Sequence, residues 1–199
     1  MKKGENLFII SGPSGAGEDS IIEGIGRHCP IERVITTTTR PPRRGESRGN
    51  PYYFVSREEF LEKVKKGLFA EYERHYNDNY YGVTREELER VAACGKIGIW
   101  KLEYKGVLSA KKLFPSITAI MITVPDLETL RRRILKRDPT VGERYLRERM
   151  EYSRRWMDRT DIYDYVVVNA DGKLSEAIEE TVAIISSKTD LCSKKSKKP

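Results

Sequence analysis

Residues 7–20 read Leu-Phe-Ile-Ile-Ser-Gly-Pro-Ser-Gly-Ala-Gly-Glu-Asp-Ser, and this stretch decides the fold class. Its first five residues form an apolar, β-rich run without polar alternation, which is typical of a strand buried on both faces of a parallel sheet. A Gly-x-x-x-x-Gly loop follows over 12–17, and Ile21, Ile22 and Ile25 then stand at helical spacing. Such a loop between a strand and a helix turns backbone N–H groups inward, so the stretch predicts a phosphate-binding loop.

The two positions that follow this loop lack the side chains that nucleotide phosphates need. The complete motif continues with a lysine for the β- and γ-phosphates and a serine or threonine whose hydroxyl binds Mg²⁺. Glu18 and Asp19 stand there instead. Asp19 and Ser20 are the two candidates for a Mg²⁺ ligand. The residues expected around a phosphate group are Gly12, Ser14, Gly15, Ala16, Gly17 and Ser20.

The rest of the chain alternates apolar runs with helix-like stretches, which is typical of a parallel α/β sheet with helices on its faces. The apolar runs are 97–100, 117–124 and 165–168, and the helix-like stretches are 86–93, 127–136, 143–159 and 174–187. Two regions break this rhythm: a polar one rich in Arg, Tyr, Gly and Pro, and an arginine-dense one around a turn at 138–140. We therefore predict a core over 5–34, 85–125 and 161–187, an inserted lobe over 35–84, and a lid over 126–160.

Composition excludes several classes of protein. Of the 199 residues, 38% are hydrophobic and 34% are charged, which suits a globular chain and excludes collagen-like and wholly disordered ones. No apolar run approaches the roughly 18 residues of a membrane helix, and too few apolar residues follow Met1 for a signal sequence. We expect a cytoplasmic protein without a membrane partner.

The cysteine spacing and the distribution of charge argue against two further kinds of site. Cys29, Cys94 and Cys192 are odd in number and irregularly spaced, so we predict neither a disulfide framework nor a zinc site. The net charge is +7, and residues 188–199 contain five lysines against one aspartate, which gives most of it. This segment has no apolar face, so we predict a disordered basic tail without specific nucleic-acid binding.

A second group of residues suits a phosphate and a purine base. Residues 36–46 read Thr-Thr-Thr-Thr-Arg-Pro-Pro-Arg-Arg-Gly-Glu, and Tyr-Tyr-Phe-Val-Ser follows at 52–56. Two arginines three positions apart, backed by a tyrosine hydroxyl, form a fork that suits a phosphate dianion, and an arginine-rich surface loop is the alternative. Glu71 adds a carboxylate, which can accept two hydrogen bonds from the guanine edge and finds no matching donors on adenine.

These motifs, together with Asn-Tyr-Tyr-Gly at 79–82, resemble the guanylate kinase family from about Leu7 to Ser187. The resemblance implies a P-loop core, a lobe that binds GMP, and a helical lid, with MgATP phosphorylating GMP to GDP. It implies that Arg40, Arg43, Tyr52 and Tyr81 hold the GMP phosphate and that Thr36, Glu71 and Glu103 contact guanine. It also implies that the lid arginines Arg133, Arg137 and Arg149 neutralise the transferred group and that Asn169 lies near the base of ATP.

The departures from the family pattern lie mostly on the ATP side. Where the family has Leu-Asp-Ile-Asp after a strand, residues 100–103 read Trp-Lys-Leu-Glu, and Val83 replaces a small polar residue. We hypothesise that Lys101 pairs with Glu18 or Asp19, because an acid and a base have exchanged places; the alternative is three unrelated exposed charges.

Losing a positioned cation costs on the order of 10² to 10³ in rate, so we predict weak or absent GMP kinase activity, with Mg²⁺ and ATP needed if any remains. A noncatalytic GMP-binding or protein-interaction module of the same fold is the alternative function.

Overall fold

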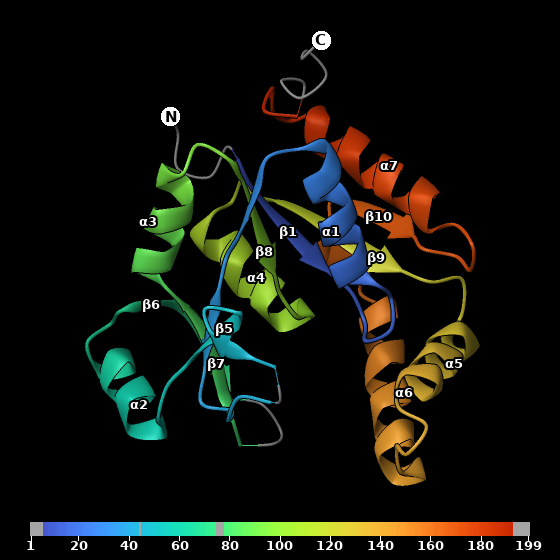
Figure 1. Cartoon of the computed structure of the whole chain (residues 1–199), viewed down its shortest axis with the longest axis horizontal. Coiled ribbons are helices and arrows are strands. Elements are labelled where there is room, and N and C mark those ends of the chain that lie inside the picture. Colours follow the sequence, from blue (N-terminus) through green and yellow to red (C-terminus); the bar gives the residue numbers. More distant parts are fainter. Residues whose placement is uncertain (1–5, 44, 75–77, 193–199) are drawn as a thin grey trace.

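The computed structural model describes residues 6–43, 45–74 and 78–192, and its core is a five-stranded sheet in the order β10-β9-β1-β8-β2 (Figure 1). All four strand pairs are parallel. This confirms the predicted parallel α/β architecture. The strands are β1 (Leu7–Ser11), β2 (Ile31–Arg33), β8 (Ile97–Lys101), β9 (Thr118–Thr123) and β10 (Tyr165–Val168).

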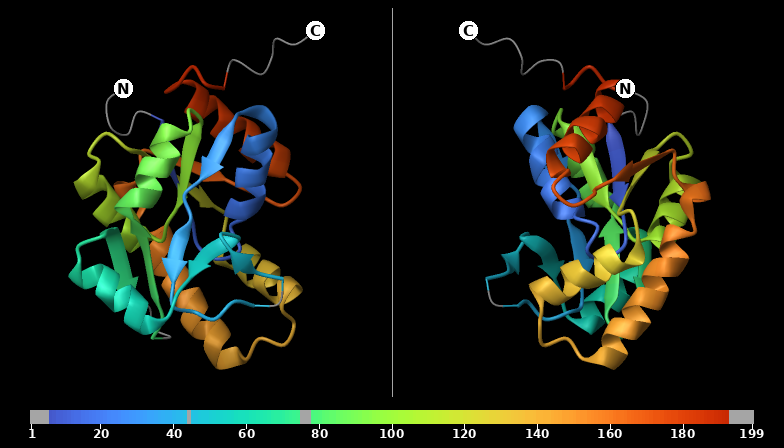
Figure 2. Two further views of the ribbon diagram at one scale, coloured as in Figure 1. Left: turned by 60° about the vertical axis from the view of Figure 1, so that its left-hand side comes forward. Right: turned by 90° about the vertical axis from the view of Figure 1, so that its right-hand side faces the viewer.

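Helices cover both faces of this sheet, because alternate residues of the central strand point to opposite sides. Phe8 and Ile10 of β1 pack in one cluster with residues of α1 (Glu18–His28) and α7 (Leu174–Ser186). Ile9 lies in a second cluster, which receives residues of α4 (Tyr104–Leu113). The turned views show α1 and α7 side by side on their face (Figure 2). The apolar run of β1 therefore has no polar alternation because both of its faces are buried.

A second five-stranded sheet is built from residues of the segment 35–84, for which an inserted lobe is predicted. Its order is β4-β5-β3-β7-β6, and α2 (Arg57–Lys65) packs on it through Phe60, whose ring stacks on that of Phe69 at 4.3 Å between centroids. Its strands are β3 (Thr36–Thr38), β4 (Ser47–Arg48), β5 (Pro51–Phe54), β6 (Phe69–Arg74) and β7 (Tyr80–Thr84), and α3 (Arg85–Ala93) leads back to the first sheet.

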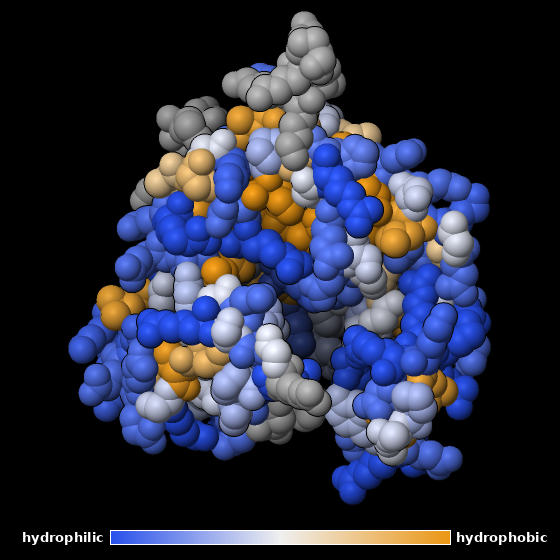
Figure 3. All heavy atoms as spheres, viewed as in Figure 1, coloured by the Kyte–Doolittle hydropathy of each residue, from blue (hydrophilic) through white to orange (hydrophobic). Residues whose placement is uncertain are grey.

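Two helices lie within residues 126–160, the segment for which a lid is predicted, and we call them the lid helices. They are α5 (Leu127–Arg137) and α6 (Glu143–Met157), followed by a 3₁₀ turn, η1 (Thr160–Ile162). Asp126 begins α5 by accepting a hydrogen bond from the backbone N–H of Thr129. The space-filling view shows the surface hollowed between the second sheet and the lid helices, with mostly hydrophilic residues at the rim (Figure 3).

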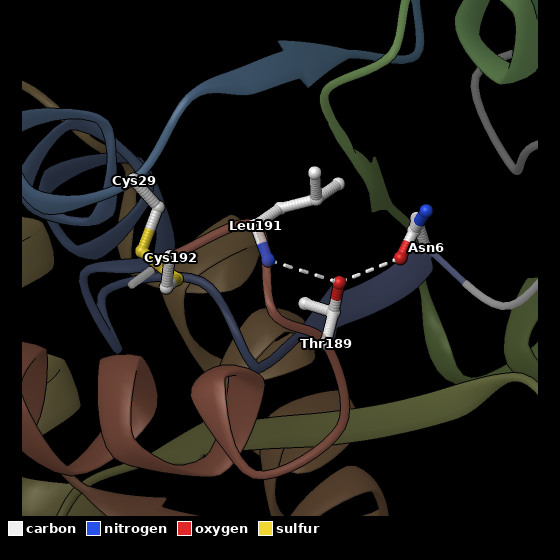
Figure 4. The surroundings of a disulfide bond; sticks show 5 residues. All are labelled: Asn6, Cys29, Thr189, Leu191 and Cys192. Carbon is white, nitrogen blue, oxygen red and sulfur yellow. Dashed lines mark hydrogen bonds between the residues drawn. A yellow bond between two sulfur atoms is a disulfide. The ribbon is translucent and has the colours of Figure 1, made fainter. Parts of the chain in front are cut away.

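A disulfide bond corrects the prediction from the cysteine count. Cys29 at the end of α1 is bonded to Cys192 beyond α7 (Figure 4). The two cysteines are 163 residues apart, and they meet because α1 and α7 pack together; sequence spacing carries no sign of this.

The segment around Cys192 is also held in place. The hydroxyl of Thr189 donates to the side-chain carbonyl of Asn6 at 2.7 Å and accepts from the backbone N–H of Leu191 at 3.4 Å (Figure 4). The predicted disorder is therefore wrong for 188–192, and 193–199 lie outside the described residues. In the part of the chain that the structure describes, no helix has the length and apolar content needed to cross a bilayer.

Candidate functional site

The glycine loop over 12–17 joins the end of β1 to the start of α1, as predicted. Gly15 and Gly17 have φ angles of 97° and 95°, in the left-handed region that side chains rarely adopt. A Cβ on Gly12 would lie 2.2 Å from the carbonyl oxygen of Ile122 on β9. The loop therefore follows its tight course because these positions lack side chains.

Asn169 and Arg133 hold this loop from the side of β10 and the lid. The side-chain amide of Asn169 donates to the carbonyl oxygen of Ala16 at 2.7 Å. Arg133 on α5 donates to the carbonyl oxygens of Gly15 at 3.2 Å and Asn169 at 2.9 Å, and it pairs with Asp171 at 2.7 Å. In this structure, Arg133 therefore joins the loop to the segment after β10.

The other two lid arginines converge on the same loop. Arg137 donates to the hydroxyl oxygen of Ser14 at 3.4 Å, and Arg149 on α6 donates to the same oxygen. Arg149 also lies over the ring of Tyr145, 5.5 Å from its centroid. The structure thus brings together the three arginines and the loop that the sequence pointed to, and it puts two guanidinium groups beside Ser14.

Lys101 and Asp19, whose charges are opposite to what the motifs lead one to expect, form an ion pair. The Nζ atom of Lys101, the last residue of β8, lies 2.6 Å from Oδ2 of Asp19, and Nη2 of Arg33 lies 2.8 Å from Oδ1. Partial burial opposes ionisation of Asp19, but Lys101 and Arg33 outweigh it, so the pKa of this carboxyl lies below its usual value. The hypothesis that Lys101 pairs with Glu18 or Asp19 is confirmed, and the partner is Asp19.

Glu18 is buried at the first turn of α1, where the phosphate-binding lysine of the complete motif would stand. Only 9% of the residue is exposed, and its Cγ atom is 3.3 Å from the Cβ position of Gly12. Burial raises the pKa of Glu18, although the charge of Lys101 opposes that rise. The buried position therefore disfavours the charged carboxylate relative to an exposed one.

These residues do not fit the phosphates and Mg²⁺ of a bound nucleotide. Asp19 has both carboxylate oxygens engaged by cations, and Ser20 beside it is exposed. Within the described ranges, no group of three or more His, Cys, Asp or Glu residues could hold a metal ion. The loop offers two acids where a polyphosphate needs a lysine and a hydroxyl.

The second sheet brings its candidate residues to one face. Thr36 is opposite Tyr52 on the neighbouring strand, and Tyr81 is opposite Thr38. Glu71 is opposite Val83 on β7, two residues beyond Tyr81. Residues paired across two strands point to the same side of a sheet, and so do residues two positions apart on one strand. The residues that therefore share one face are Thr36, Tyr52, Tyr81 and Glu71. The rings of Tyr52 and Tyr81 meet edge to face, with centroids 6.0 Å apart.

Arg40 and Arg43 lie in the loop that follows β3. The guanidinium of Arg40 pairs with Glu46 at 2.9 Å and lies 5.5 Å from the ring centroid of Tyr52. The same glutamate accepts a hydrogen bond from the backbone N–H of Arg43 at 2.7 Å, whereas no described residue pairs with the guanidinium of Arg43. Glu46 thus holds the guanidinium of Arg40 beside Tyr52 and fixes the backbone of Arg43.

Two acids stand where the guanine contacts are predicted. Burial and the neighbouring charge of Glu73 raise the pKa of Glu71 to about 7. Glu103 precedes α4 and accepts a hydrogen bond from the Tyr152 hydroxyl of α6 at 2.9 Å, which links it to the lid. Val83, the residue that departs from the family pattern, is fully buried in the core cluster with Trp100.

Arg33, Glu46 and Tyr152 are site residues that the sequence analysis did not select. Arg33 ends β2 next to β8, so its position at the carboxyl end of a strand was the available signal. Glu46 belongs to the quoted arginine motif, and its spacing from Arg40 could have suggested the pair. Nothing in the sequence around Tyr152 points to Glu103, 49 residues away.

Comparisons with known proteins agree with this architecture. The family model for guanylate kinase matches residues 4–188. The chain is 36% identical to the guanylate kinase of Clostridium tetani, over 94% of this chain and 87% of that protein. It is 37% identical to the guanylate kinase of Haemophilus influenzae, over 83% and 81%. Among solved structures, the guanylate kinase of Anaplasma phagocytophilum superimposes with a TM-score of 0.65 at 29% identity, covering 94% of this chain and 85% of that one.

Proposed function

Since the chain belongs to the guanylate kinase family, we propose that it binds GMP in the second sheet and transfers a phosphoryl group from ATP weakly or not at all. Guanylate kinases convert ATP and GMP to ADP and GDP, with Mg²⁺ accompanying ATP. The observation that carries the proposal is the double ion pair of Asp19 with Lys101 and Arg33 at the start of α1.

The acceptor side keeps the groups that a guanine nucleotide needs. The guanidinium of Arg40 and the hydroxyls of Tyr52 and Tyr81 suit the phosphate, because charge-assisted hydrogen bonds from a fixed fork are strong. Arg43 adds a second guanidinium for the same anion. Glu71 on the shared face suits the N1–H and amino donors of guanine. These groups bind and orient the acceptor without help from the loop.

The donor side has lost its electrostatic support. Phosphoryl transfer depends on cations positioned around the transferred group, and removing one costs on the order of 10² to 10³ in rate. Glu18 replaces such a cation by an acid, and Asp19 is already neutralised by side chains of the protein. Arg137 and Arg149 remain beside Ser14, and they can still attract an anion to the mouth of the loop. The residues at the start of α1 do not fit Mg²⁺, because both carboxylate oxygens of Asp19 are engaged by cations of the protein.

Calorimetry with GMP and with MgATP in separate titrations tests this proposal. We expect GMP to bind and MgATP to show no binding, and a coupled assay to give a turnover below about 1 per second. Arg40→Met should abolish GMP binding, whereas Arg57→Met, which removes an exposed arginine paired with Asp78 in the same lobe, should not. Ordinary turnover, or tight binding of MgATP without GMP, would refute the proposal.

The same proposal includes a cytoplasmic location without membrane or specific nucleic-acid partners. The Cys29–Cys192 disulfide bears on the location, because reducing compartments keep most thiols free. Alkylation of the protein in lysed cells, followed by mass spectrometry of these two cysteines, measures their state there. Reduced thiols fit the cytoplasm, and a fully oxidised pair would argue for another compartment.

A further inference from the structure

The lid helix α6 is fixed to the core sheet at its C-terminal end. The indole N–H of Trp156 donates to the hydroxyl oxygen of Tyr163 at 2.9 Å, and the hydroxyls of Tyr163 and Ser11 are hydrogen-bonded at 2.9 Å. Ser11 ends β1, so this buried chain of hydrogen bonds joins the helix to the strand before the glycine loop. The last turn of α6 therefore keeps a fixed position against the core.

Tyr152, one turn earlier on α6, reaches from this fixed end to Glu103. Its hydroxyl donates to Oε2 of Glu103 at 2.9 Å. The centroid of its ring lies 5.7 Å from that of Tyr104 and 5.8 Å from that of Trp156. Because aromatic contacts of this kind orient a ring, packing sets the position of the hydroxyl that Glu103 meets.

Glu103 stands beside the face of the second sheet that carries the candidate guanine contacts. It comes directly before α4, and Lys105 in the first turn of α4 pairs with Glu73 on β6 at 2.7 Å. Glu73 is opposite Tyr81 and two residues beyond Glu71, so all three belong to one face. This ion pair and the packing of α4 on β6 place the start of α4, and Glu103 with it, next to the acceptor residues.

A glutamate at position 103 gains from being held before a ligand binds. It has one more rotatable bond than the aspartate of the family pattern, and immobilising a flexible side chain on binding costs affinity. The hydrogen bond from Tyr152 fixes the carboxylate in advance and removes part of that cost.

We propose that Tyr152 is a positioning residue for guanine selection, which holds the Glu103 carboxylate towards the 2-amino group of GMP. The inference rests on the proposed function, because the nucleotide must first bind on the second sheet. Glu71 can accept from N1–H and one amino N–H, which leaves the other amino N–H for Glu103. Inosine 5′-monophosphate (IMP) keeps N1–H and lacks the amino group, so it gains no contact from Glu103. The preference for GMP over IMP then depends on a residue of the lid.

Calorimetry with GMP and IMP on wild type, two single variants and their double variant tests the inference. Glu103→Ala should weaken GMP binding about tenfold, the loss of one hydrogen bond to a charged group, and change IMP affinity by less than about twofold. Tyr152→Phe keeps the ring and its packing, so it should weaken GMP binding about fivefold and leave IMP affinity within about twofold. The double variant should bind GMP no more weakly than Glu103→Ala, because Tyr152 acts through Glu103.

The matched control is Tyr163→Phe. It removes another buried hydroxyl next to the same end of α6, one whose partners are Trp156 and Ser11. This variant should lower the affinities for GMP and IMP equally or not at all. A loss selective for GMP would assign the effect to a loosened lid and overturn the inference.

The remaining outcomes separate the inference from the proposed function. If GMP and IMP both bind and Tyr152→Phe weakens them equally, or strengthens GMP binding, Tyr152 does not position a guanine contact and the inference is overturned. Losses that add in the double variant would overturn it too, because independent contacts add. Equal affinity of wild type for GMP and IMP would refute selection by the amino group, while GMP binding stands. If GMP itself does not bind, the proposed function is refuted and the inference with it.

Discussion

Raising the pH from 6 to 8 should strengthen GMP binding, because Glu71 must be a carboxylate to accept two hydrogen bonds from guanine. Burial and the charge of Glu73 raise the pKa of Glu71 to about 7, so the group titrates inside this range. The neutral acid presents an O–H to guanine donors and loses one acceptor. Protonation therefore competes directly with the base.

The size of the effect follows from that pKa. About one Glu71 in eleven is ionised at pH 6 and about ten in eleven at pH 8, so the apparent affinity should rise about tenfold across the range. The phosphate of GMP also titrates near pH 6, about as phosphate monoesters do, and adds a smaller rise of its own. The two contributions must be measured apart.

Titration calorimetry at pH 6, 7 and 8 with wild type and Glu71→Gln makes that separation. The glutamine variant binds more weakly and keeps only the rise due to the phosphate. Glu73→Gln should move the wild-type midpoint to lower pH, because it removes the neighbouring negative charge. Equal pH dependence in wild type and Glu71→Gln, or none in either, would refute the reasoning.

The same titration should appear in the stability of the free protein. The pKa of Glu71 is raised in the folded state, so its contribution to stability is complete below about pH 4.5 and is lost as the pH rises through about 7. Urea unfolding of wild type should show this decline between those values. Glu71→Gln should show less of it.

Three other perturbations address the loop and the disulfide. A triple variant that combines Glu18→Lys, Asp19→Ser and Lys101→Asp should raise turnover by at least about 10² in a coupled assay. No gain would show that the loss of phosphoryl transfer has its cause outside these three positions. Reductant, or Cys192→Ser, should lower the free energy of unfolding in urea by about 2–4 kcal/mol, and the variant should not respond further to reductant. Gly17→Ala should cost at least about 1 kcal/mol in the same assay, because its Cβ would lie 2.6 Å from a side-chain amide nitrogen.

Local patterns predicted the elements that have a strong periodicity. The run over 7–11, the glycine loop and the isoleucines of α1 were readable because strand, turn and helix each impose their own spacing. β2, with three residues, is too short to show a period. α4 contains Gly106, which lowers helix propensity, and its pattern did not stand out from the surrounding loop.

In the candidate site, the sequence revealed contacts between residues whose types differ from the expected motif. It did not reveal contacts between residues that only the fold brings together. Lys101 and Asp19 were paired from sequence because each has the opposite charge to the residue expected there. Arg33 was missed because β2 meets β8 only in the folded sheet, and nothing local marks it as a partner of Asp19. Cys29 and Cys192 were missed for the same reason, since the packing of α1 on α7 brings them together.

The glycines of the loop bear on how such proteins are recognised in genomes. Gly12 has a main-chain oxygen in the place of its missing side chain, and Gly17 is closed in by Asn169, so a side chain at either position would destabilise the fold. Selection on folding alone would retain them after any nucleotide had ceased to bind. A survey that counts this glycine signature would therefore overestimate the number of working phosphotransferases, and the two residues after it discriminate better.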